Sequence, residues 1–171
     1  MPHPLVLQLR FTRSEFARGL RGVTAADARV RLGPMNCLSW NVGHLAWQEQ
    51  RYFLTIGQGE TPYPEIASRF ASGGPASTPE LAKVLAAWRS ITEAADPWLD
   101  SLTVARLQEH PIRDGQPLPR IFGDLLQRTI YHYWYHTGEN LAIRQQLGHK
   151  RLPQFVGSID DHAPYRPEAA T

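Results

Sequence analysis

The chain has 171 residues, 42% of them hydrophobic, and its 18 basic residues nearly balance its 16 acidic ones. This composition is typical of a soluble globular protein, and the scattered basic residues argue against a nucleic-acid partner. No apolar run approaches the roughly 18 residues of a membrane span, and the N-terminal stretch lacks a basic leader and a cleavage site. We therefore expect a cytoplasmic protein with no membrane partner.

The only cysteine, Cys37, excludes an intrachain disulfide and a zinc site built from several thiolates. Any metal ion would be held by histidines and carboxylates. Cys37 itself is predicted to be a small buried residue rather than a reactive thiol at a helix start. The sequence also lacks the G-x-S-x-G elbow of serine hydrolases and the glycine-rich phosphate loops, so these classes are excluded.

The first half of the chain is predicted to form two helices. Apolar positions recur at helical spacing over residues 4–22, which indicates the first helix. The polar segment that follows is predicted to be a connection with one helical turn at residues 25–28. A second helix begins around Cys37 and runs to about Ile56, where the stretch GQG ends it.

The third helix follows a long connection. Residues 57–77 are rich in glycine and proline, which is typical of a lid, a binding loop or a disordered segment. The stretch STPEL then opens the third helix, with Ser77 or Thr78 as its cap and Pro79 in its first turn. A bend is expected further along this helix, at Pro97, because proline removes one hydrogen bond of the helix.

The fourth helix follows a second proline-rich loop and runs from about Ile121 to Leu147, with Gly148 terminating it. Residues 153–171 are predicted to be an irregular tail. No segment has a convincing strand pattern. We therefore predict an all-α four-helix bundle that forms a single domain over residues 1–171, with long connections after the second and third helices.

The stretch TIYHYWYHTGEN carries three ionisable side chains on one face of the fourth helix. At about 100° per residue, His136 lies about 40° from His132, and Glu139 lies about 20° from it in the opposite direction. This face should point to the core, where an unpartnered polar group costs about 1–3 kcal/mol. Histidines spaced i, i+4 can present their ring nitrogens to one metal ion, and two hydrogen-bonded core histidines are the alternative.

A metal site needs a further ligand from a facing helix, and His44 in the second helix is the candidate. Periodicity alone places His44 at the margin of the core. Glu139 is interpreted as a further ligand, an acceptor for a histidine N–H, a general base, or the partner of a neighbouring arginine. Glu49 is expected to be a surface carboxylate. The remaining histidines are expected to be solvated, namely His3, His110, His149 and His162.

The stretches LSWNVGHLAWQEQRYF and HYWYHTGENLAIRQQLG, within the four-helix plan, resemble the DinB-like (DinB/YfiT) superfamily from about Leu5 to Gly148. Its members carry a histidine in the second helix and an H-x-x-x-H pair in the fourth, which together bind one divalent metal ion. The resemblance implies that His44, His132 and His136 hold the metal and that His44 turns toward the bundle centre. Zinc and nickel suit imidazole best, and iron or manganese stays open.

Several members of this superfamily are thiol-dependent transferases or isomerases, and others are described as metal-dependent hydrolases. The resemblance therefore implies a small-molecule substrate, with a low-molecular-weight thiol as a candidate partner, and a homodimer. The open face of the metal is expected to look toward residues 57–77. Three interpretations remain open: a metal-dependent enzyme, a metal-binding or stress-response protein without turnover, and a metal-free bundle with buried histidines.

Overall fold

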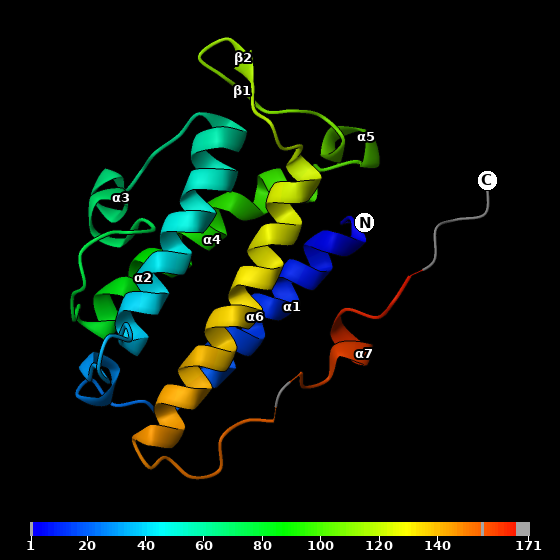
Figure 1. Ribbon diagram of the computed structural model, residues 1–171. Coiled ribbons are helices and arrows are strands. Elements are labelled where there is room, and N and C mark those ends of the chain that lie inside the picture. The colour runs from blue at the N-terminus through cyan, green and yellow to red at the C-terminus, as the bar shows by residue number, and fades with distance from the viewer. Residues whose placement is uncertain (1, 155, 167–171) are drawn as a thin grey trace.

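The computed structural model describes residues 2–154 and 156–166 (Figure 1). Four long helical segments form the body of the protein, and the predicted all-α class is confirmed. They are α1 (Pro4–Gly19), α2 (Leu38–Glu49) with its π-helical continuation η2 (Gln50–Ile56), α4 (Leu81–Asp100) and α6 (Phe122–Gln146). Among the described residues, no helix combines the length and the apolar character that crossing a membrane requires.

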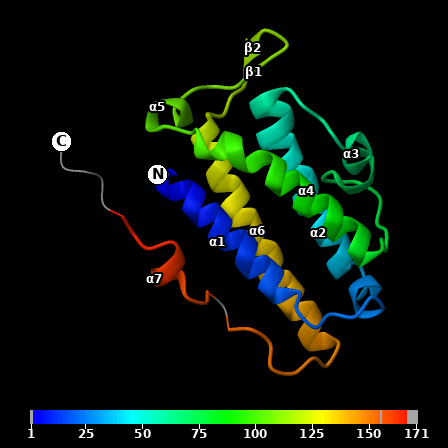
Figure 2. The same ribbon diagram turned by 180° about the vertical axis from the view of Figure 1, so that it is seen from behind.

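The direction of the helices explains the length of the connection between α2 and α4. α1 and α6 run one way, while α2 and α4 run the other way (Figures 1 and 2). α2 packs against both α4 and α6, and α1 packs against α6. Because α2 and α4 are parallel neighbours, the chain must travel back along the bundle between them. This return segment is not wholly irregular, since it forms α3 (Pro64–Phe70), which packs on α2.

The other connections also contain short elements. η1 (Asp27–Arg29) joins α1 to α2, near the predicted helical turn. Between α4 and α6 the chain forms α5 (Val104–Leu107) and a small antiparallel hairpin of β1 (Ile112–Arg113) and β2 (Gln116–Pro117), which projects from the end of the bundle (Figure 1).

The C-terminal tail differs from its predicted irregular form. It contains α7 (Ile159–His162), which lies against α1. The side-chain amide of Gln8 donates to the carbonyl of Ala163 at 2.6 Å, and the ring of Phe11 stacks on His162 with 6.4 Å between the ring centroids. These contacts with α1 account for the helical turn in a segment whose own sequence shows no helical period.

At the helix ends, one detail differs from the sequence-based expectation and another agrees with it. α4 begins at Leu81, after Pro79, and no side chain caps its first turn, so the prediction of a Ser77 or Thr78 cap is wrong. The helix continues through Pro97 to Asp100. Gly148 follows the end of α6 with φ of 79°, the left-handed conformation predicted for that position.

A buried polar network connects the four long helices. Arg13 of α1 donates from Nε and Nη2 to the Glu49 carboxylate of α2, and both distances are 2.7 Å. The hydroxyl of Tyr133 in α6 donates to Glu49 at 2.9 Å and accepts from the indole N–H of Trp88 in α4 at 2.6 Å. Glu49 is 0% exposed, so the prediction of a surface carboxylate is wrong. Burial and the charge of Glu49 raise the pKa of Tyr133.

Gly43 allows α3 to approach α2 closely. A Cβ atom added at Gly43 would lie 2.7 Å from the ring of Phe70. We expect Gly43→Ala to lower the free energy of unfolding by about 1–3 kcal/mol, because the Phe70 ring must move. Gly138→Ala in α6 is the matched control, since its added Cβ would meet no atom within 4 Å and should stabilise the helix by about 0.5–1 kcal/mol. Equal effects of the two substitutions in urea unfolding would contradict this account.

Candidate metal centre

Three histidines from two helices converge between α2 and α6. His44 comes from α2, and His132 and His136 come from successive turns of α6. One ring nitrogen of each lies within 4.8 Å of the corresponding nitrogens of the other two. The Nε2 atoms of His132 and His136 are 2.9 Å apart. His44 and His136 are buried, and His132 is half-buried.

The second nitrogen of each ring already has an oxygen partner. Nδ1 lies 2.6 Å from the Phe70 carbonyl in His44, 2.8 Å from Gln48 Oε1 in His132, and 2.7 Å from Glu139 Oε2 in His136. A neutral imidazole that donates from Nδ1 has its lone pair on Nε2. The three lone pairs then face a common space, and the pair that is 2.9 Å apart repels unless a cation lies near it. This donor set fits a divalent metal ion.

The ring of His44 is held in place by two tryptophans on its own helix. Trp40 stacks on one side with 4.9 Å between ring centroids, and Trp47 stacks at 5.2 Å. His44 is 7% exposed, so it is buried, as the family resemblance implies, and the position at the margin of the core that helical periodicity alone gave it is wrong. The helical wheel failed because α2 is covered on several sides, by α3, α4 and α6.

Glu139 holds His136 from outside the cluster. Its Oε2 atom accepts from His136 Nδ1 and, at 3.0 Å, from the side-chain amide of Asn41. Glu139 does not belong to the group of side chains whose ligand atoms converge. Within residues 2–154 and 156–166, no lysine or arginine forms an ion pair with it, so the arginine partner considered for it is not found. The position suits an acceptor that orients the ring.

Burial keeps two of the rings neutral. Burial, and then the positive charges of His136, His44 and Arg128, lower the pKa of His132 to about 3. Burial also lowers the pKa of His44, against the opposing effect of the Phe70 carbonyl. Both imidazoles are therefore unprotonated at neutral pH, the form in which histidine binds a metal ion.

The lowered pKa of His132 predicts an acid-sensitive metal-free protein. Between the pKa of an unfolded histidine, 6.5, and the folded value of about 3, the unfolded chain binds a proton that the folded chain does not. Stability is therefore lost as the pH falls through this window, by about 1–3 kcal/mol at pH 4 after allowance for solvent screening. Urea unfolding of the metal-free protein should lose less stability between pH 7 and pH 4 in His132→Gln than in the wild type. Equal losses would contradict the lowered pKa.

A pocket of about 470 Å³ opens beside the cluster. Both His44 and His132 line it, so the candidate metal centre has an accessible side. A larger pocket of about 600 Å³ lies between α3 and α4, but none of the three clustered histidines lines it. The smaller pocket can therefore bring a molecule to the histidines.

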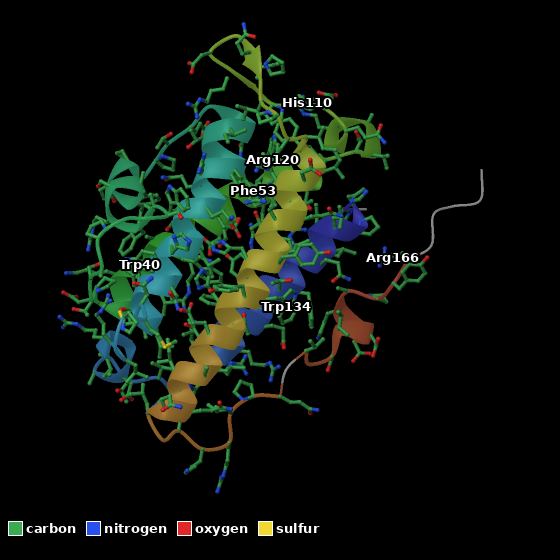
Figure 3. All side chains as sticks on the ribbon, viewed as in Figure 1. Trp40, Phe53, His110, Arg120, Trp134 and Arg166 are labelled. Atoms are coloured by element: carbon green, nitrogen blue, oxygen red, sulfur yellow. The ribbon has the colours of Figure 1, made fainter. Side chains whose placement is uncertain are left out.

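The other residues considered from the sequence lie away from the cluster. Figure 3 shows His110 at the end of the bundle where α6 begins. His3, which was expected to be solvated, is half-buried and accepts from the backbone N–H of Leu5 as the N-cap of α1. His149 contacts Asp27, and His162 is exposed. Cys37 is buried, which confirms the prediction for it.

Two of the three imidazole partners, Gln48 and the Phe70 carbonyl, were not found from the sequence, whereas Glu139 was considered there as an acceptor for a histidine N–H. Gln48 lies one helical turn after His44 and holds His132 on the facing helix. The partner of His44 is the backbone carbonyl of Phe70, 26 residues away, and a backbone oxygen cannot be recognised from the residue type. The i, i+4 spacing of Gln48 from His44 is the one pattern that could have indicated such a role.

A family model described as DinB superfamily matches residues 8–139 of the chain. The matched range includes His44, both histidines of α6 and Glu139. No curated protein matches the chain.

Proposed function

The chain belongs to the DinB superfamily, and on that premise we propose that it binds one divalent metal ion and uses it in a reaction on a small molecule. The ligands are His44, His132 and His136. The observation that carries the proposal is the convergence of three imidazole nitrogens whose partner nitrogens are already hydrogen-bonded. Zinc and nickel are the favoured ions, because both suit imidazole.

The groups around the three histidines hold each imidazole ring in its orientation. Gln48 and Glu139 fix the tautomers of His132 and His136, and the Phe70 carbonyl does the same for His44. Glu139 is a positioning residue in this proposal, because its oxygen contacts the outer nitrogen of His136 rather than the shared space. Asn41 in turn holds Glu139.

The chemistry follows from the ligand set. If His44, His132 and His136 held a divalent ion, the ion would lower the pKa of a water molecule or a thiol and would polarise a carbonyl group. His44 and His132 also line the open pocket, which admits the substrate. The proposed reaction is a transfer to or from a low-molecular-weight thiol, or a hydrolysis, in the cytoplasm.

Turnover by the metal-loaded protein tests this proposal. The wild type loaded with zinc or nickel should accelerate conjugation of cysteine to an electrophile or hydrolysis of 4-nitrophenyl acetate, and a chelator should abolish the acceleration. His136→Ala should be inactive, while His110→Ala, which alters an exposed histidine outside the cluster, should retain the rate. Rates that are equal in wild type and His136→Ala would instead indicate a metal-binding protein without turnover.

A further inference from the structure

The pocket beside the histidines is lined by positive charge and aromatic rings. Two arginines line it, Arg51 of η2 and Arg128 of α6, together with Trp47, Tyr52 and Tyr131. Among the described residues that line it, none is acidic. The pocket therefore carries two uncompensated positive charges when its histidines are neutral.

Both arginines lie on the same side of the histidine cluster. Arg51 follows His44 by seven residues, about two helical turns, and Arg128 precedes His132 by four, about one turn. Because α2 and α6 run in opposite directions, forward along α2 and backward along α6 lead toward the same end of the bundle (Figure 1). The pocket therefore extends from the imidazoles toward the two guanidinium groups.

Neither arginine is neutralised by a carboxylate. Other arginines of the chain form ion pairs, among them Arg10 with Asp100 at 2.7 Å and Arg13 with Glu49. In the part of the chain that the structure describes, no carboxylate lies within ion-pair distance of Arg51 or Arg128. The guanidinium of Arg51 lies over the ring of Trp47, 5.4 Å from its centroid. This contact orients Arg51 and leaves its charge available to a ligand.

The π-helix supports a functional role for this region. Arg51 and Tyr52 both belong to η2, and π-helical turns are rare and frequent at functional sites. The neighbouring Gln50 fixes the backbone of Tyr63, because its side chain donates to the Tyr63 carbonyl and accepts from the Tyr63 N–H, both at 2.9 Å. The π-helix thus holds the segment before α3 through Gln50, and its residues Arg51 and Tyr52 line the pocket.

We propose that this pocket binds a small organic anion whose carboxylate or phosphate is held by Arg51 and Arg128 while its remaining part faces His44 and His132. The inference rests on the proposed function for the identity of the reacting end. The anion site itself depends on the two arginines, so it can be tested separately. Trp47 and Tyr52 suit an anion with a flat apolar part.

Calorimetric titrations of the zinc-loaded protein in low-salt buffer test the inference. The probes are benzoate and phenyl phosphate, which separate a carboxylate from a phosphate ligand, and benzamide, which lacks the charge. At least one anion should bind while benzamide should not. Arg51→Gln and Arg128→Gln should each weaken binding about tenfold to a hundredfold, because a hydrogen bond to a charged group contributes about 1.5–3 kcal/mol. Arg89→Gln, at an exposed arginine of α4 outside this pocket, is the matched control and should bind as the wild type does.

The outcomes distinguish the pocket from the metal centre. The same titrations on the metal-free protein should keep the dependence on both arginines, and this result would support the anion site even if no metal bound. Absence of binding by both anions, or equal affinities in Arg51→Gln, Arg128→Gln and Arg89→Gln, would overturn the inference while leaving the metal centre intact. Equal binding of benzamide and benzoate would overturn it as well.

Discussion

Replacing Arg13 by methionine is expected to lower the free energy of unfolding by about 3–5 kcal/mol. The substitution leaves Glu49, which is 0% exposed, without its bidentate partner in the middle of the bundle. The hydroxyl of Tyr133 still donates to Glu49, but one neutral hydrogen bond does not replace a charged pair. The loss should appear in urea unfolding at pH 7.

The double variant Arg13→Met, Glu49→Leu separates the effect of an unpaired charge from the effect of a lost contact. Removing both charges should recover most of the loss, because apolar side chains of similar size often replace a buried pair without net destabilisation. Asp96, the second partner of Arg13, is 37% exposed and keeps its pairing with Arg10. A double variant as unstable as Arg13→Met would show that the network stabilises the bundle by other means.

Replacing His136 by alanine is expected to weaken metal binding by more than about 100-fold, because loss of an outer partner alone costs about 10-fold to 100-fold. Gln48→Ala should fall within that smaller range, since it frees the Nδ1 atom of His132 without removing a ligand. Competition with a chromogenic chelator measures both affinities. His110→Ala is the control, since His110 is exposed and contacts the Leu118 carbonyl instead of the cluster. Equal affinity in wild type and His136→Ala would exclude His136 as a ligand.

The bundle itself was largely predictable from the sequence, because its four long helices follow the apolar period of the chain. The end of α6 was predictable for a local reason, since Gly148 adopts the left-handed conformation expected after a helix. α3 and α7 were not predictable, because each is a short helix whose stability depends on packing against α2 or α1. The π-helical form of η2 also left no periodic signal in the sequence.

The part of the candidate site that could be predicted from helical spacing is the pair of histidines in α6. The relation of His132 to His136 is a spacing within one helix, whereas the place of His44 came from a family resemblance. Glu49 and the Phe70 carbonyl show the limit of this reasoning, because their partners lie 36 and 26 residues away in the chain. A helical wheel also assumes one solvent-facing side, and α2 has contacts with α3, α4 and α6.

Titration of the metal-free protein with cobalt(II), followed by visible absorption, tests the three-histidine centre most directly. The wild type should bind one equivalent per chain with a sharp end point. His44→Ala should show no sharp end point, because it removes the one ligand supplied by α2. The account would be contradicted if the wild type bound no cobalt. It would also be contradicted if His44→Ala bound one equivalent of cobalt as tightly as the wild type does.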